Sequence, residues 1–263
     1  MKMKQLKLQL INSLAHNLRF DGRKPLEWRK IEIEYGISKN AEGSARVKFG
    51  DTEVLAGVKL SIGEPYPDTP DKGALMVEAD LSPMSSPEFE AGPPDVKAIE
   101  LARVVDRGIR EAKAIDMEKL CIEKGKKCWI VSIDVVTIND AGNLLDASAL
   151  AALAALKETR MPKVEDGIIK YGELTKEPLP LNKEPIAVTV LKIGNFFIVD
   201  PLVEEEQAYD AKLTVTTTDD SICALQKGGT ETLSIGDIEK MIDIGIEKSK
   251  EIRKQLAKAK GAK

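Results

Sequence analysis

Residues 137–156, TINDAGNLLDASALAALAAL, carry the clearest structural signal in the chain: a strand, a glycine-bearing turn and an apolar helix. The start of a helix leaves backbone N–H groups unpaired and carries the positive end of the helix dipole, so this order of elements commonly holds a phosphate. The turn at 140–146 nevertheless contains no Lys, Arg, Ser or Thr, and it contains Asp140 and Asp146. The stretch therefore predicts a loop with the shape of an anion-binding site but without a basic side chain.

The same turn also allows a purely structural interpretation. In it, Asp146 caps the following helix while Leu144 and Leu145 pack inward. No G-x-x-x-x-G-K-[ST] run occurs in the sequence, so a P-loop nucleotide site is excluded. From the turn alone, both the functional and the structural interpretation stay open.

Composition limits the classes of protein to which the chain can belong. Its 263 residues are 43% apolar and 31% charged, which is ordinary for a globular protein with a substantial core. The net charge of -4 argues against a protein that coats nucleic acid by bulk charge, because that affinity comes from many Lys and Arg contacts. Any contact with nucleic acid would need a local patch of cations.

Few residues are available for metal or nucleophilic chemistry. Cys121, Cys128 and Cys223 form no C-x-x-C pair, so we expect no zinc knuckle or disulfide framework and interpret the thiols as buried or idle. The single histidine, His16, lies in a helical stretch, where a surface position is expected. We therefore expect no metal site, no cofactor and no catalytic triad.

The N-terminal stretch MKMKQLKLQLINSLAHNLRF predicts an amphipathic helix, with Leu10, Leu14 and Leu18 at helical spacing. Its polar residues interrupt any apolar region of a signal peptide. No run approaches the roughly 20 apolar residues that span a bilayer. We expect no membrane contact and a cytoplasmic location.

Alternation and turn signals organise the rest of the chain into two units of strands followed by helices, which suggests two related α+β halves. Residues 48–53 predict a hairpin turn, and seven of the thirteen prolines fall within 61–94, which predicts long loops. Ser234 and Asp237 form a capping box before the last helix. Strands are expected near 31–33, 45–49, 54–58, 75–79, 128–138, 186–193, 196–200, 211–217 and 222–227, and helices at 95–114, 146–159 and 235–257.

Three arginines share one face of the helix expected at 95–114, because Arg103, Arg107 and Arg110 stand at positions i, i+4 and i+7. They could form a ladder for a phosphodiester chain, since Arg binds phosphate in bidentate fashion. They could equally be a solvated face joined by local ion pairs, each worth about 0.3–0.5 kcal/mol. The spacing permits pairs between Glu100 and Arg103, Asp106 and Arg110, and Arg107 and Glu111.

Two further stretches are weaker candidates. The acidic run Glu204-Glu205-Glu206 with Asp210 could hold a divalent metal or act as acid and base, although such runs are more often solvated surface. The stretch 42–45, EGSA, precedes a strand and reads as a turn at strand entry.

Four stretches, taken in order, resemble the RNase PH family of phosphate-dependent 3′-to-5′ exoribonucleases. GEPYPDTPDKG at 63–73 and the closing helix also fit, and the match covers nearly the whole chain from about residue 20. Within the family, the chain is similar to the archaeal exosome ring, specifically its larger, non-catalytic subunit. The four stretches are DGR at 21–23, EGSARVKFGDTEVLAGV at 42–58, ELARVVDRGIR at 100–110 and IDVVTINDAGNLLDASALAAL at 133–153.

The resemblance implies a fold and a domain plan. The fold is α+β and RNase PH-like, with two related βαβ-type halves, the first similar to ribosomal protein S5 domain 2, and an N-terminal helix. We place the N-terminal helix and loop at 1–26, the first half at 27–160, a linker at 161–185 and the second half at 186–263.

The resemblance also implies partners and an RNA path. Three copies of such a subunit alternate in a ring with three catalytic RNase PH-like subunits, RNA-binding cap subunits dock on the ring, and single-stranded RNA threads its channel. In the family the R-x-x-x-R-x-x-R helix directs arginines at RNA, which assigns that role to Arg103, Arg107 and Arg110. The acidic net charge is then no obstacle, because the partner supplies part of the field.

Active members carry a Gly-Gly-Thr/Ser-Arg run after the Asp of this turn, and that run holds the attacking phosphate. Laid over this sequence from Asp140, the glycine is kept at Gly142, the hydroxyl becomes Asn143 and the guanidinium becomes Leu144. Losing such a contact to phosphate costs roughly 2–4 kcal/mol, and Asp146 near the turn adds repulsion. The resemblance therefore predicts a degenerate phosphate loop and no catalytic residue.

Active members also carry two Asp residues six apart, and matching the second to Asp210 puts Glu204 at the first.

We expect a non-catalytic ring subunit that pairs with the catalytic subunit, shapes its active site and binds RNA for phosphorolytic 3′-to-5′ degradation. The alternative is a phosphate-dependent exoribonuclease active by itself as a homo-oligomer. A third reading is a stand-alone RNA-binding module.

Overall fold

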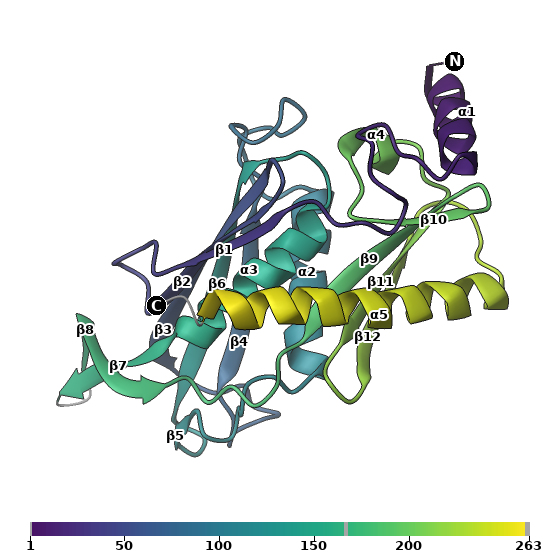
Figure 1. Cartoon of the computed structure of the whole chain (residues 1–263). Helices are drawn as coiled ribbons and strands as arrows, with labels where there is room; N and C mark the ends of the chain where they lie inside the picture. Colours follow the sequence, from purple (N-terminus) through teal and green to yellow (C-terminus); the bar gives the residue numbers. More distant parts are fainter. Residues whose placement is uncertain (1, 166–167, 261–263) are drawn as a thin grey trace.

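The computed structural model of the chain describes residues 2–165 and 168–260. Two sheets lie on either side of a pair of helices, and a long C-terminal helix covers the outer face of the second sheet (Figure 1). The expected α+β architecture of two halves behind an N-terminal helix is confirmed. No helix in the described part of the chain has the length and apolar character needed to cross a membrane.

The first sheet is built mainly from antiparallel neighbours, in the order β1-β2-β3-β6-β4, with β4 parallel to β6 and β5 paired to β6 beyond that path. The hairpin turn expected at 48–53 is confirmed, since it joins β2 to β3 with Phe49 opposite Thr52. Strict alternation buries every second residue of β3, as expected for a sheet with one face on a core. The strands are β1 (Ile31–Tyr35), β2 (Gly43–Phe49), β3 (Thr52–Gly63), β4 (Ala74–Asp80), β5 (Cys121–Glu123) and β6 (Lys127–Asn139).

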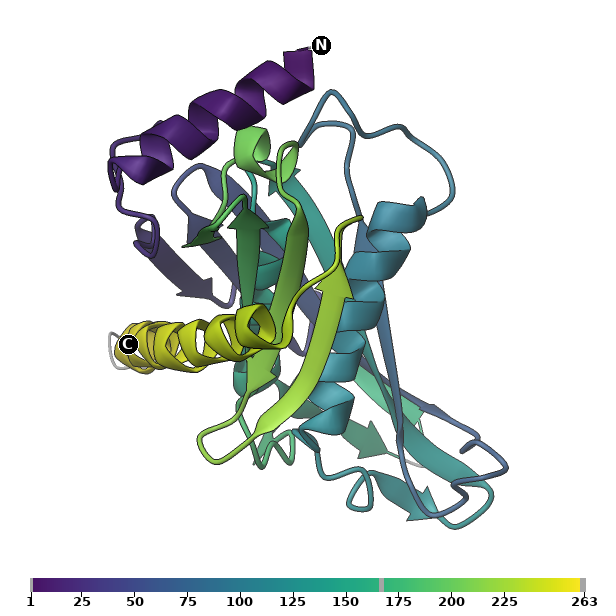
Figure 2. The same ribbon diagram turned by 90° about the vertical axis from the view of Figure 1, so that its right-hand side faces the viewer.

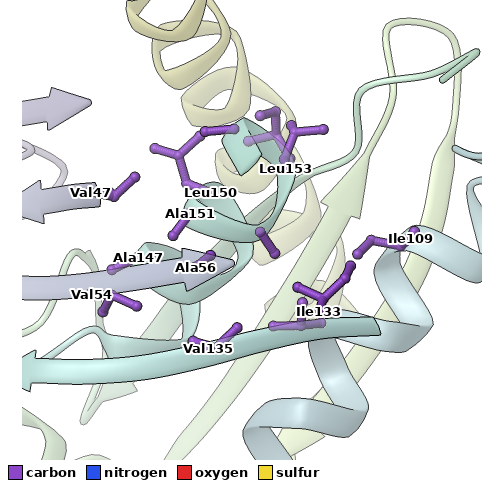
Figure 3. Packing of buried hydrophobic residues seen from close by; sticks show 14 of the residues in the cluster. Val47, Val54, Ala56, Ile109, Ile133, Val135, Ala147, Leu150, Ala151 and Leu153 are labelled. Carbon is purple, nitrogen blue, oxygen red and sulfur yellow. The ribbon is translucent and has the colours of Figure 1, made fainter. Parts of the chain in front are cut away.

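Two helices cover this sheet: α2 (Val96–Glu111) and α3 (Leu144–Glu158). Asp95 caps α2 as predicted, accepting the Ala98 N–H at 2.8 Å. Helix α3 is apolar on all sides and is correspondingly buried on all sides, because a sheet lies against each of its faces. Small residues bring it close to the first sheet, with Ala147 and Ala151 near Val54 and Ala56 (Figure 3).

The second sheet has the order β10-β9-β11-β12, all antiparallel. Along β11 the alternation faces Val215 toward the C-terminal helix and Thr216 toward α2, where glycines at 245 and 108 allow close approach. Figure 2 shows α2 running beside β12. The elements of this half are β9 (Ile186–Ile193), β10 (Phe196–Val199), α4 (Val203–Glu206), β11 (Ala211–Thr217), β12 (Ile222–Gly228) and α5 (Ile235–Lys260).

Helices α5 and α1 both follow signals that the sequence shows. The predicted capping box is confirmed, because the Asp237 N–H donates to Ser234 Oγ and the Ser234 N–H donates to the Asp237 carboxylate, each at 3.1 Å. Helix α1 (Lys2–Ala15) buries Leu10 and Leu14 in a small cluster with residues of β9 and β10.

The segment placed as a linker at 161–185 contains a β-hairpin. Strands β7 (Arg160–Glu165) and β8 (Ile168–Pro178) pair with each other and project from the body of the protein (Figure 1). Its polar composition suggested a loop, but ion pairs of Lys163 with Glu173 and of Lys170 with Glu165 join the two strands. Cross-strand pairs of opposite charge can support an exposed ribbon that has no apolar core.

Candidate functional site

The turn between β6 and α3 has the backbone of an anion-binding loop. Gly142 has φ +89° and Asn143 has φ +61°, so two successive residues lie in the left-handed region. A Cβ on Gly142 would stand 2.4 Å from the Pro201 carbonyl oxygen, so only glycine fits there. This explains why the glycine remains at Gly142 although the neighbouring positions differ from the active pattern.

Carboxylates of the protein itself take the N–H groups that such a loop would offer to an anion. The Gly142 N–H donates to the Asp140 carboxylate and the Asn143 N–H donates to the Glu206 carboxylate, each at 2.9 Å. Burial raises the pKa of Asp140, with the nearby Glu88 charge adding to the shift. The remaining two N–H groups of 140–143 donate to the Ser85 carbonyl and to Thr52 Oγ1.

One arginine does reach the turn, and it binds the opposite side of the backbone. Arg29, on the segment before β1, donates to the carbonyl oxygens of Ala141 at 2.8 Å and Gly142 at 3.0 Å. Its Nε and Nη2 donate to Asp200 at 2.9 and 2.7 Å. The guanidinium therefore holds the loop through its carbonyl oxygens, and its N–H donors are bonded within the protein.

Asp200, immediately after β10, is the counter-charge of Arg29. Its side chain is fully buried and also accepts from Arg23 at 2.8 Å and from the Asn143 side-chain amide at 3.0 Å. Burial alone would raise the pKa of Asp200, but the hydrogen bonds and charge of Arg29, with the charge of Arg23, hold it below its usual value. The carboxylate is therefore a permanent charge that fixes the loop.

Asp146 does not cap α3 as the structural interpretation expected. The N-cap position is Asn143, without a side-chain cap bond, and the helix begins at Leu144. Asp146 is fully buried and accepts the N–H and hydroxyl of Thr189 at 3.0 and 2.7 Å, joining α3 to β9. Burial raises its pKa to about 7, and it does not line the cavity beside the loop, so it is not the source of repulsion that we expected.

A cavity of about 270 Å³ opens beside the loop, lined by Asp140, Asn143, Leu144 and Glu206. Its cations are already engaged: Lys97 pairs with Glu88 at 3.2 Å, and Lys212 pairs with Glu100 at 3.5 Å. An apolar side chain at Leu144 and two carboxylates face the space in which the attacking phosphate would lie.

The acidic run separates into members with different roles. Glu205 is buried in an ion pair with Arg19, and Asp210 pairs with Lys7 and accepts the Gly194 N–H at 2.7 Å. Glu204 is exposed, and neither it nor Asp210 lines the cavity. Within residues 2–165 and 168–260 no three His, Cys, Asp or Glu side chains gather as a metal site would require.

The α2 arginines divide into two kinds. All three are exposed, but Arg110 donates to both Asp106 oxygens, at 2.7 and 3.0 Å, and to the Leu75 carbonyl on the edge of β4 at 3.2 Å. Arg103 and Arg107 have no hydrogen bond or ion pair among the residues that the structure describes. Of the local pairs that the spacing permits, only that of Arg110 forms there. Glu100 pairs with Lys212 instead.

The surroundings of these arginines are electrically unequal. On one side, Arg103 and Arg107 border β11 and β12, next to Thr216 and Gln226. On the other side lies a groove of about 1260 Å³ between α2 and β4. Its charged lining is Arg103 and seven carboxylates: Glu78, Asp80, Glu88, Glu90, Asp95, Asp106 and Asp134. The charges that line the groove are therefore mainly negative, whereas the β12 side of α2 carries Arg103 and Arg107 without a lining carboxylate.

Sequence comparisons cover nearly the whole chain. The descriptions that match are "3′ exoribonuclease family, domain 1" over residues 27–162 and "3′ exoribonuclease family, domain 2" over residues 183–248. The exosome complex component Rrp42 of Archaeoglobus fulgidus is 48% identical over 248 residues, which is 94% of each chain. The component of the same name from Methanopyrus kandleri is 46% identical over 251 residues, again 94% of each.

Solved structures agree with the sequence comparisons. A chain of the Archaeoglobus fulgidus exosome with RNA bound to the active site superposes with TM-score 0.89 at 46% identity, covering 97% of this chain and 98% of that one. A chain of an archaeal exosome core gives TM-score 0.85 at 42% identity, covering 97% of each. Rice Rrp46, at 21% identity and TM-score 0.69, shares the fold.

Proposed function

The chain belongs to the 3′ exoribonuclease family of RNase PH, and from that premise we propose that it is a ring subunit of an archaeal exosome that does not itself catalyse phosphorolysis. The family predicted from the four motifs is thereby confirmed. The subunit completes the ring with the catalytic RNase PH-like subunit and holds single-stranded RNA. Full-length similarity to exosome core chains supports the ring assignment.

The observation that carries the non-catalytic assignment is the filled loop. Asp140 and Glu206 accept the N–H groups of Gly142 and Asn143, and Leu144 replaces the guanidinium of the active pattern. An inorganic phosphate would have to displace two carboxylates and would gain no charge-assisted contact from Leu144. The alternative, a chain that is active by itself as a homo-oligomer, is not favoured.

The RNA-holding role is assigned to the outer face of α2. Arg103 and Arg107 are exposed and have no protein partner within the described residues, so a phosphodiester can take their donors without breaking an existing ion pair. Arg110 contributes less, because an RNA phosphate would compete with Asp106 and the Leu75 carbonyl. Contacts to phosphate hold RNA without reading its sequence, as a processive channel requires.

The test is an activity assay of the purified chain, the catalytic partner subunit and their reconstituted ring, with poly(A), inorganic phosphate and Mg²⁺. Nucleoside diphosphate should appear with the ring and stay at background with this chain alone. Release by this chain alone would contradict the proposal, provided that Gly142→Val abolishes it. The Val side chain cannot fit against Pro201, so loss of activity in that variant would exclude a contaminant.

A further inference from the structure

Two cysteines face each other across neighbouring strands at the end of the first sheet away from the loop. Cys121 of β5 is paired in register with Cys128 of β6. The Trp129 N–H donates to the Leu120 carbonyl at 2.8 Å, and that bond flanks the pair, so Cys121 and Cys128 form a non-hydrogen-bonded pair. Residues so placed have Cα atoms about 4.5 Å apart, within the range of about 4.4–6.8 Å that a disulfide spans.

The two thiols differ in access. Cys128 is fully buried, whereas Cys121 is partly exposed, and both are free thiols. Burial, with the neighbouring Cys121, raises the pKa of the Cys128 thiol. Cys223 lies on β12 in the other sheet. The arrangement gives one thiol that a reagent can reach and a second thiol, opposite it on the next strand, that the reagent cannot reach first.

The β5–β6 hairpin also holds the proline-rich loop 63–73, a motif that the ring and RNA assignments leave without a role. The Gly125 N–H at the hairpin tip donates to the Pro70 carbonyl at 2.7 Å, and Lys124 lies 3.7 Å from Asp71. The Gly73 N–H donates to Met117 just before β5, at 2.8 Å. A covalent link between β5 and β6 would therefore stiffen the support of this loop as well.

We propose that Cys121 and Cys128 are a modification site that closes to an intramolecular disulfide in the presence of a low-molecular-weight disulfide. The Cys121 thiolate attacks the small disulfide, forming a mixed disulfide and releasing one small thiolate. The Cys128 thiolate then attacks Cys121 Sγ, forming the Cys121–Cys128 bond and releasing the second small thiolate. Two protein thiols are oxidised and one small disulfide is reduced to two thiolates, which take up the two protons that Cys121 and Cys128 give up.

The experiment exposes the folded full chain to oxidised glutathione, quenches with acid, and counts thiols by reaction with a chromogenic disulfide. Peptide mass analysis then locates any link. The wild-type chain and Cys223→Ser should each lose two titratable thiols and gain one intramolecular link, with loss of two hydrogens, between the peptides that hold Cys121 and Cys128. The oxidised chain should melt a few degrees higher than the reduced chain.

Two variants separate the steps. Cys128→Ser should stop at a glutathione adduct on Cys121, because the resolving thiol is missing, and Cys121→Ser should keep the buried Cys128 thiol and form no link. The proposal is overturned if the wild-type chain keeps all three thiols, if the link includes Cys223, or if wild-type Cys121 itself stops at the glutathione adduct. These readouts do not depend on RNA or on the partner subunit. Their outcome is therefore independent of whether the proposed function is correct.

Discussion

The turn at 140–146 and the outer face of α2 both carry groups suited to phosphate, yet their donors are in opposite states. In the turn, the N–H groups of 140–143 and the guanidinium of Arg29 are all bonded within the protein. On α2, Arg103 and Arg107 stand in solvent with their donors free of described partners. A donor that is already satisfied by a carboxylate of the protein offers an incoming phosphate little net gain.

The comparison shows that residue type alone does not identify a phosphate ligand. Arg29 and Arg107 carry the same group, but Arg29 is largely buried and bonded to the loop, whereas Arg107 is exposed and has no partner among the described residues. The difference lies in Asp200, which stands 171 residues from Arg29 in sequence and neutralises it in the fold.

The largest effect is expected from Arg29→Ala. Removing one partner of a buried ion pair leaves Asp200 without its main counter-charge, which costs about 3–5 kcal/mol in the free energy of unfolding. Denaturant unfolding of the chain measures it. Arg46→Ala is the matched control, since its pairs with Glu34 and Glu53 are exposed and its loss should cost only a small fraction of that. Equal effects of the two variants would show that Arg29 does not hold the loop.

Asp146→Asn should remove a pH dependence of stability. The pKa of Asp146 rises from 3.8 to about 7 on folding, so the unfolded chain loses its proton first as pH rises. The wild-type chain should therefore lose up to about 4 kcal/mol of stability between pH 4 and pH 8 relative to the variant. The Asn side chain keeps a carbonyl oxygen that can accept the Thr189 N–H, and its amide can donate to Thr189 Oγ1, so the fold is retained.

Unfolding curves of both proteins over that pH range test this expectation. Other titrating groups are shared and cancel in the difference between the two chains. Parallel pH profiles would mean that Asp146 ionises as easily in the folded chain as in the unfolded one.

Arg103→Glu with Arg107→Glu should weaken RNA retention by the reconstituted ring about 10–100-fold at low salt. The slope of log affinity against log salt should fall by about 1.4, because two phosphate contacts are lost from a single strand. Ring assembly, followed by gel filtration, should be unchanged. Unaltered RNA binding would show that both arginines belong to a solvated helix face that does not bind RNA.

A matched pair of single substitutions sharpens the distinction within α2. Arg107→Ala should reduce RNA binding several-fold, whereas Arg110→Ala should change it less than about twofold, because Arg110 is engaged with Asp106. The measurement is the same filter or anisotropy assay. Equal losses would show that the Asp106 pair does not withhold Arg110 from RNA.

Refitting the loop should raise its phosphate affinity only when a carboxylate is removed as well. Leu144→Arg alone should gain almost no phosphate affinity, because the new guanidinium would pair with Glu206 and Asp140. Leu144→Arg with Glu206→Ala should bind phosphate about tenfold better than the single variant. Titration calorimetry in phosphate against chloride reads this out. Tight binding by Leu144→Arg alone would show that the carboxylates do not fill the loop.

Much of the fold could be predicted from patterns of residues that are close in sequence. The hairpin turn at 48–53, the cap at Asp95 and the capping box at Ser234 depend on residues close in sequence, and all three formed as predicted. The β7–β8 hairpin was missed because its strands bury little and carry no apolar alternation. The start of α3 was misplaced because Asp146 resembles a cap and instead bonds to Thr189 on another strand.

The candidate site divides in the same way. The motif alignment located the degenerate loop at Gly142, Asn143 and Leu144, with the changes at the last two, since these are neighbours along the chain. It put Glu204 in the place of an active-site carboxylate, whereas Glu206 is the residue that reaches the loop. No pattern near Arg29 in the sequence predicts its role, because that role depends on pairing with Asp200.

The sequence by itself determined the family, most of the elements and the absence of a cation from the turn, because motifs and hydrophobic periodicity are properties of adjacent residues. Only the tertiary structure decided which charged side chains are paired within the protein and which are not. Burial and pairing are set by residues that are distant in sequence and neighbours in space, and the strength of a charge as a ligand depends on both.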